Sequence, residues 1–71
     1  MIGVISGSKL KKYRKKANLT QQELGNLVGV HEATICKYER EVGRNPTVET
    51  LKRMANVFGC LADDLYSDNF R

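Results

Sequence analysis

The sequence lacks tryptophan and contains a single proline, while 41% of its 71 residues are hydrophobic. So few turn-forming residues disfavour a β-sandwich, and this apolar fraction disfavours a disordered chain. A chain of this length buries only about 60% of the surface that it exposes when unfolded, so a deep catalytic cleft is not expected. We therefore predict one all-α domain over residues 1–71, a compact bundle of about five short helices with its core at about 8–66.

Long apolar runs are also missing. No stretch approaches the roughly 20 residues that cross a bilayer, and Met1–Ile5 is too short for a cleavable signal. Cys36 and Cys60 form no close pair, and together with one histidine they do not supply a tetrahedral zinc site. We expect a soluble, reduced, cytoplasmic protein with no membrane contact and no metal. A redox or metal switch at Cys36, with His31 nearby, is the weaker alternative.

The residue patterns of enzymes are missing as well. There is no glycine-rich phosphate loop and no nucleophile with an adjacent base, and Asp63-Asp64 is typical of the acidic first turn of a short helix. We therefore expect neither catalysis nor a cofactor.

Positive charge is what the sequence has in excess. Twelve Lys and Arg against eight Asp and Glu leave a formal charge of +4. The excess is concentrated in Lys9, Lys11, Lys12, Arg14, Lys15 and Lys16. Such a cluster favours a phosphate-bearing partner, because cations placed beside phosphates release condensed counterions. A merely solvated face is the alternative, whereas the apolar stripe Leu10, Tyr13 and Ala17 is too narrow for insertion in a membrane interface.

Apolar residues at three- to four-residue spacing predict five helices. Their approximate ranges are Gly7–Ala17, Gln21–Val28, His31–Arg40, Val48–Phe58 and Ala62–Tyr66. The second begins most firmly, because Thr20 and Glu23 form a capping box. Asn18 and Gly29 follow the first two helices and suit a left-handed exit, and Thr47 is a good N-cap after Pro46.

The second and third helices form one unit in which two steeply crossing helices share a core. The shared apolar positions are Leu24, Val28, Val30, Ile35 and Tyr38. Gly25 falls where the helices touch, so a side chain much larger than alanine would separate them, and Gly29 allows the tight turn.

With these elements in place, the sequence resembles the phage repressor and Cro-like helix-turn-helix family, also called the xenobiotic-response-element type, over about residues 8–66. The resemblance is carried by Leu10-x3-Arg14, Leu19-Thr20-Gln21-x-Glu23-Leu24, Gly29-Val30, Thr34-Ile35-x2-Tyr38-Glu39, Asn45-Pro46-x4-Leu51 and Ala55-x2-Phe58-Gly59. It implies a lambda-repressor-like fold whose second helix crosses the DNA backbone and whose third enters the major groove.

The resemblance also implies the DNA-binding residues. They are Gln21, His31, Glu32, Ala33, Lys37, Arg40, Arg44 and Asn45. Gln21 would lie beside a phosphate at a helix N-terminus. Lys37 would donate to guanine O6 or N7, Glu32 would accept from cytosine N4, and Ala33 would meet a thymine methyl. Arg40, Arg44 and Asn45 would supply at least one phosphate contact.

Each assignment has a simpler alternative. Gln21 can be only the first residue of a capped helix, Glu32 can serve the helix dipole, and Lys37 can be a plain surface lysine. His31 replaces the usual Ser or Thr cap, so it is either a solvent-facing substitute or a DNA contact. The segment with Arg40, Arg44 and Asn45 can be a solvated loop.

Two further family features concern structure. Arg14 and Glu39 match positions that form a buried or half-buried ion pair tying the first helix to the third, which would fix the orientation of the recognition helix. Two positions depart from the family: Glu41 stands where a glycine often ends that helix, and Leu61 replaces a small polar cap. Leu61 with Tyr66 and Phe70 is either half of a dimer contact or part of the domain's own core.

The leading hypothesis is a sequence-specific regulator of transcription, a repressor that occludes a promoter by binding double-stranded DNA as a homodimer at half-sites about one helical turn apart. The rival is an antitoxin-like or adaptor module of the same fold that acts mainly through a protein partner. A nonspecific nucleic-acid binder is the third possibility. Salt dependence together with sequence preference distinguishes the three.

Overall fold

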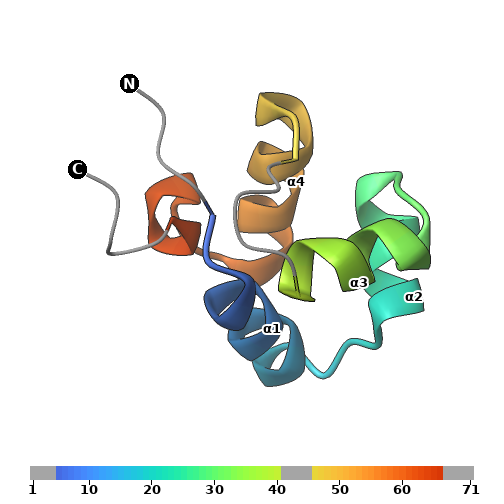
Figure 1. Cartoon of the computed structure of the whole chain (residues 1–71). Helices are drawn as coiled ribbons and strands as arrows, with labels where there is room; N and C mark the ends of the chain where they lie inside the picture. Colours follow the sequence, from blue (N-terminus) through green and yellow to red (C-terminus); the bar gives the residue numbers. More distant parts are fainter. Residues whose placement is uncertain (1–4, 41–45, 67–71) are drawn as a thin grey trace.

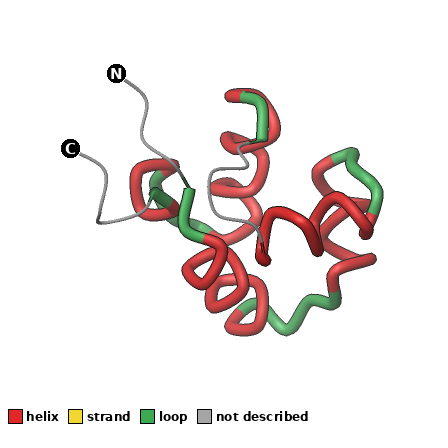
Figure 2. Tube along the Cα trace, viewed as in Figure 1, coloured by secondary structure: helices red, strands yellow, loops and turns green. Residues whose placement is uncertain are grey.

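The computed structural model describes residues 5–40 and 46–66, and these ranges fold as an all-α bundle (Figures 1 and 2). Its elements are α1 (Gly7–Lys16), α2 (Gln21–Val28), α3 (Glu32–Arg40), α4 (Val48–Phe58) and the 3₁₀ helix η1 (Ala62–Leu65). The predicted number, order and type of elements are confirmed, except that the last one is a single 3₁₀ turn. No helix in the described ranges is long and apolar enough to cross a membrane.

The helices start and stop where the sequence supplies local hydrogen-bonding groups. At the start of α2 the hydroxyl of Thr20 accepts from the Glu23 N–H and the Glu23 carboxylate accepts from the Thr20 N–H. The hydroxyl of Thr47 caps α4 by accepting from the Thr50 N–H. Asn18 has a φ of 60° and Gly29 a φ of 81°. Both predicted left-handed exits are therefore confirmed.

All four α-helices and η1 contribute to one apolar core. Its buried members are Ile5, Leu10, Leu24, Val28, Ile35, Leu51, Met54 and Leu65. Three apolar residues of the predicted helical patterns lie outside it: Ala17 is exposed, and Leu27 and Val48 are each 57% exposed. Ala17 and Val48 lie at helix ends, beyond the reach of the bundle interior, so periodicity alone overestimated the apolar faces.

The two ends of the described chain lie against each other (Figure 1). Ile5 forms an isolated antiparallel bridge with Tyr66, and the Ser6 N–H donates to the Leu65 carbonyl at 2.8 Å. Ile5 is 3% exposed, so a residue to which the sequence assigned no role belongs to the core. Tyr66 packs against that core in an extended conformation and is not part of the last helix.

Leu61 is 71% exposed, so it does not contribute to the domain's own core, which was one of its two interpretations. Phe70, Glu41, Arg44 and Asn45 lie outside the described residues, and their predicted roles stay predictions.

Candidate nucleic-acid interface

The helix-turn-helix is built around the close approach of α2 to the start of α3. Gly25 is buried, and a Cβ atom at this position would overlap the backbone carbonyl oxygen of Val30. Because that oxygen belongs to the backbone of the turn, even alanine requires the two helices to shift. The limit is therefore stricter than the sequence suggested, and the helix crossing depends on the absence of any side chain here.

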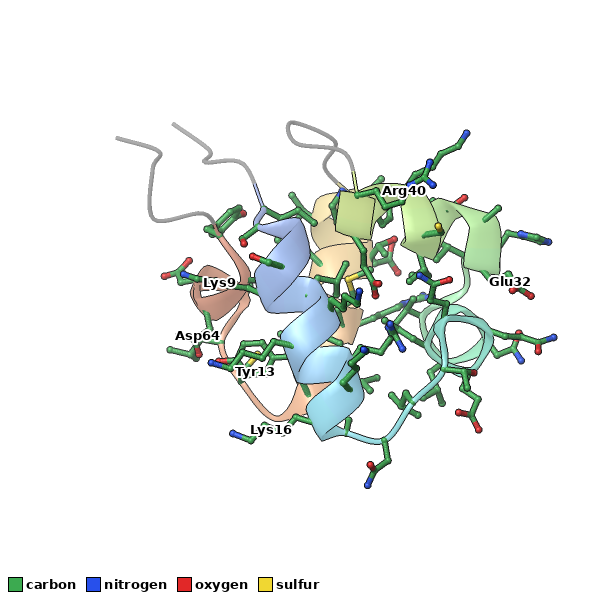
Figure 3. The ribbon with its side chains drawn as sticks, turned by 60° about the horizontal axis from the view of Figure 1, so that its bottom comes forward. Lys9, Tyr13, Lys16, Glu32, Arg40 and Asp64 are labelled. Carbon is green, nitrogen blue, oxygen red and sulfur yellow. The ribbon has the colours of Figure 1, made fainter. Side chains whose placement is uncertain are left out.

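One side of α3 is buried and the opposite side faces solvent. Ile35 is fully buried, while Thr34 and Tyr38 are half-buried on the same side. The exposed residues at and after the helix start are His31, Glu32, Ala33, Lys37 and Arg40. Figure 3 shows Glu32 and Arg40 extending into solvent from the two ends of α3. The structure thus brings five of the eight predicted DNA-binding residues together on one helical surface.

His31 caps the recognition helix with its ring. Its Nδ1 accepts a hydrogen bond from the Ala33 N–H at 3.0 Å. Side-chain oxygens of Ser, Thr, Asp or Asn are the preferred groups for this task, because the first N–H groups of a helix have no partner within it. The ring therefore replaces the usual cap and remains exposed to solvent. This hydrogen bond holds the His31 side chain at the edge of the candidate interface.

The predicted ion pair between α1 and α3 is present. Arg14 Nε donates to Glu39 Oε2 at 2.6 Å and Arg14 Nη2 donates to Glu39 Oε1 at 3.2 Å. The Arg14 side chain is 9% exposed and that of Glu39 is 3% exposed. Arg14 Nη1 also donates to the Leu19 carbonyl at 2.7 Å, so the guanidinium ties the linker before α2 to the same pair.

Gln21 joins this network from the first turn of α2. Its Nε2 donates to Glu39 Oε1 at 3.1 Å, so Arg14, Gln21 and Glu39 connect α1, α2 and α3 through one carboxylate. A glutamine amide has two N–H groups, and the second one remains for an outside acceptor. The contact with Glu39 holds the Gln21 side chain in place before any ligand binds, and no sequence pattern indicated this contact.

Gly7 is a second residue whose role sequence reasoning missed. A Cβ on Gly7 would overlap the backbone carbonyl oxygen of Glu39 at the end of α3. The start of α1 therefore approaches the recognition helix without an intervening side chain. A glycine at the first position of a helix is a weak signal, and only its contact with a distant helix reveals the constraint.

The lysines of α1 divide between two flanks of the helix. Gly7 and Arg14 are the α1 residues that contact α3. At about 100° per residue, Lys11 and Lys15 lie next to these two residues around the helix. Lys9, Lys12 and Lys16 instead line a hollow with Tyr13, next to η1. The basic residues predicted from the sequence therefore follow the exposed side of α1, with Lys11 and Lys15 towards the recognition helix and Lys9, Lys12 and Lys16 towards η1.

Comparison with known proteins agrees with this geometry. The helix-turn-helix family model matches residues 10–65, and the chain belongs to this family. An uncharacterized HTH-type transcriptional regulator of Archaeoglobus fulgidus is 35% identical over 60 residues, which are 83% of this chain and 82% of that protein. The cryptic phage CTXphi transcriptional repressor RstR, from Vibrio cholerae, is 32% identical over 62 residues, 87% of this chain. The chain spans 55% of the length of that repressor.

Solved structures share the fold over most of the chain. The P22 c2 repressor, in complex with a synthetic operator, aligns with a TM-score of 0.79 at 30% identity, covering 89% of this chain and 94% of that one. A chain of the SinR–SinI protein complex aligns with a TM-score of 0.77 at 26% identity, covering 87% of this chain and 60% of that one. The resemblance to phage repressors that the motifs indicated is confirmed.

Proposed function

We propose that this chain is a sequence-specific regulator of transcription that binds double-stranded DNA with α3 in the major groove. The observation that carries the proposal is the exposed surface of α3, where Lys37 and Arg40 add positive charge to a helix held firmly by Gly25 and the Arg14–Glu39 pair. An α-helix fits the major groove, where every base pair presents a distinct set of donors and acceptors. The similar P22 c2 repressor was solved on an operator, which supports the same mode of binding.

The base-reading residues are exposed side chains of α3, from its first residue Glu32 to Lys37. Lys37 donates to a guanine, Glu32 accepts from a cytosine N4 and Ala33 contacts a thymine methyl. Gln21 donates to a phosphate with its second N–H, at the N-terminus of α2 where the helix dipole favours an anion. Arg40 binds the backbone at the end of α3, with Arg44 and Asn45 after it.

The protein acts as a cytoplasmic homodimer on two half-sites about one helical turn apart and represses by occluding a promoter. It has no catalytic role and needs no cofactor. Two features support repression: the chain is 32% identical to a phage transcriptional repressor over 62 residues, and a compact domain bound over a promoter blocks access to it.

The test is selection of duplexes with a randomised segment by the full chain at near-physiological salt, followed by sequencing. Enrichment of an inverted repeat is expected, with affinity for it falling linearly in log–log form as salt rises. Lys37→Ala is expected to relax the preference at one base pair, at a cost of about 1–3 kcal/mol. Lys52→Ala, which removes the same charge from an exposed position on α4, is the matched control.

A second function is favoured by one observation. The similar chain in the SinR–SinI complex is bound to a protein, so an antitoxin-like or adaptor module that acts through a protein partner is the rival. A folded protein that enriches no sequence would support this rival. A steep salt dependence without any preference would instead indicate nonspecific binding of nucleic acid.

A further inference from the structure

One residue, His31, accepts three of the hydrogen bonds that hold the start of α3. Its carbonyl accepts from the N–H groups of Thr34 at 2.9 Å and Ile35 at 3.2 Å. Its ring accepts at Nδ1 from the Ala33 N–H at 3.0 Å. The first N–H groups of a helix have no partner within it, so the ring supplies an acceptor that the backbone lacks. The first turn of α3 therefore depends on the state of this ring.

A histidine cap differs from the usual caps because its ring can gain a proton near neutral pH. Histidine ordinarily titrates between about pH 5 and 8, whereas a Ser or Thr hydroxyl keeps its lone pairs throughout that range. The neutral ring carries one hydrogen, and with that hydrogen on Nε2 it accepts at Nδ1. The protonated ring carries a hydrogen on both nitrogens and accepts nothing. A proton on Nδ1 and the hydrogen bond from Ala33 therefore exclude each other.

The charged groups around His31 are engaged elsewhere or exposed. On α2, the Glu23 carboxylate belongs to the capping box of that helix. On α4, Arg53 lies against the turn before His31 and is paired with Glu49. Glu32, next to His31 in the chain, is exposed, and within residues 5–40 and 46–66 no ion pair involves His31. A positive ring at this position is opposed by the dipole of α3, whose positive end lies here.

We propose that His31 is a positioning residue for the DNA-binding surface and that a proton on its ring weakens DNA binding. Ala33 and Glu32, two of the residues proposed to read bases, stand in the turn that the ring holds (Figure 3). Without the cap this turn frays, and both side chains lose their fixed place in the groove. A histidine that contacts a phosphate behaves in the opposite way, because its added charge strengthens binding. The inference rests on the proposed function and adds a dependence on pH.

The cap is tested first without DNA, by NMR of the full chain between about pH 8 and about pH 5. His31 is the only histidine of the sequence, so its ring signals need no further assignment. The neutral ring is expected to carry its hydrogen on Nε2. Protection of the Ala33 amide against hydrogen exchange, corrected for the intrinsic effect of pH, is expected to fall about fivefold when the ring is protonated. A neutral ring with its hydrogen on Nδ1, or equal protection in both ring states, would overturn the inference.

DNA affinity is then measured at both pH values on the duplex selected in the test of the proposed function. His31→Asn keeps a side-chain acceptor without a titrating ring, so it reports the pH dependence of all other groups. Relative to His31→Asn, the wild type is expected to lose about fivefold in affinity at the lower pH, with an unchanged salt slope. His31→Ala, which has no cap in either state, is expected to bind weakly at both. Lys52→His in the His31→Asn protein moves the ring to an exposed position of α4 and is expected to behave as His31→Asn does.

Two results on DNA would overturn the inference and leave the proposed function standing. One is the same pH profile for the wild type and His31→Asn. The other is wild-type binding that strengthens on acidification with a salt slope steeper by about 1, which would indicate an imidazolium on a phosphate. Selection of no duplex would overturn the proposed function and the effect on DNA binding together, and the Ala33 amide would then show separately whether the proton controls the cap.

Discussion

Opposite charges lie on both flanks of α1, but within residues 5–40 and 46–66 they are paired on only one of the two flanks. Towards α3, the Arg14 guanidinium and the Glu39 carboxylate are buried together and share their hydrogen bonds with Gln21 and the Leu19 carbonyl. Towards η1, Lys12 and Lys16 face Asp63 and Asp64 across a groove of two adjoining hollows. A buried pair has lost its water and must be satisfied inside the domain, whereas exposed charges stay hydrated at little cost.

The difference indicates how burial changes the role of the same residue types. The buried cluster fixes how the recognition helix lies against α1 and α2. Its role is therefore to set the arrangement of these helices. The exposed charges along the groove leave this arrangement unchanged. Substitutions on the buried flank should therefore lower the stability of the domain far more than substitutions along the groove.

The largest expected effect is on the buried pair. Arg14→Met leaves the Glu39 carboxylate buried without its partner, and we expect a loss of about 3–5 kcal/mol in the free energy of unfolding. Lys12→Met, on the groove flank, is expected to change it by no more than about 0.5 kcal/mol. Urea denaturation followed by circular dichroism measures both.

The double variant Arg14→Met with Glu39→Leu sharpens the test. Removing both charges leaves no buried charge unpaired, so the double variant is expected to be more stable than Arg14→Met alone. If Arg14→Met does not fold at all while the double variant folds, the conclusion is the same, because the unpaired carboxylate is then the source of the instability. Additive losses would show that the carboxylate is not the source of the cost.

The next effect concerns the close contact at the start of α1. Gly7→Ala places a Cβ against the Glu39 carbonyl oxygen, so α1 must move away from α3. We expect a loss of about 1–3 kcal/mol, the usual range for overpacking, together with weaker DNA binding. Ser8→Ala, at an exposed neighbouring position, is the control, and equal stability of the two variants would contradict a tight contact.

A smaller effect is expected at the side-chain caps of α3 and η1. His31→Ala removes the ring nitrogen that accepts from the Ala33 N–H, with an expected loss of about 1 kcal/mol, and His31→Asn should restore most of it. Because this cap starts the recognition helix, DNA affinity should fall as well. Asp64→Ala removes the cap of η1 on the groove side and should leave DNA affinity per bound dimer unchanged. Thermal unfolding and a DNA titration of each variant separate the two.

The smallest effect is the titration of Cys60, which lines the groove. Burial, and secondarily the negative charge of Asp64, raise the pKa of this thiol. Because the folded state favours the neutral thiol, its contribution to stability is complete below the pKa of the unfolded thiol and is lost as pH rises through the folded value. Iodoacetamide should alkylate Cys60 with a midpoint above the roughly 8.5 of a free thiol, and Asp64→Asn should lower that midpoint slightly. A midpoint at or below the free value would contradict the burial.

Local signals in the sequence predicted the elements well. The capping box at Thr20 and Glu23, the Thr47 cap, and the exits at Asn18 and Gly29 are short-range hydrogen-bonding and backbone preferences, which act within a few residues. Periodicity predicted the buried side of α3 but overestimated burial at Ala17, Leu27 and Val48. Whether an apolar residue is covered depends on which element lies over it.

The candidate site was predicted as a set of positions. The family resemblance grouped His31, Glu32, Ala33 and Lys37 as DNA-binding positions, and all four are exposed at or within α3. The motifs did not show that Gln21 donates to Glu39 or that the His31 ring caps α3. Such contacts depend on side chains from different elements, or on a rotamer that the sequence does not specify.

The sequence by itself determined the order of the helices and most of their limits, the need for a small residue at position 25, and the pairing of Arg14 with Glu39, which the family pattern implied. Each of these follows from local geometry or from a motif with fixed spacing. Only the tertiary structure placed Ile5 in the core, set Gly7 against the end of α3, and divided the lysines of α1 between two flanks. Those features depend on how helices distant in the chain lie against each other, and packing of the whole bundle decides that arrangement.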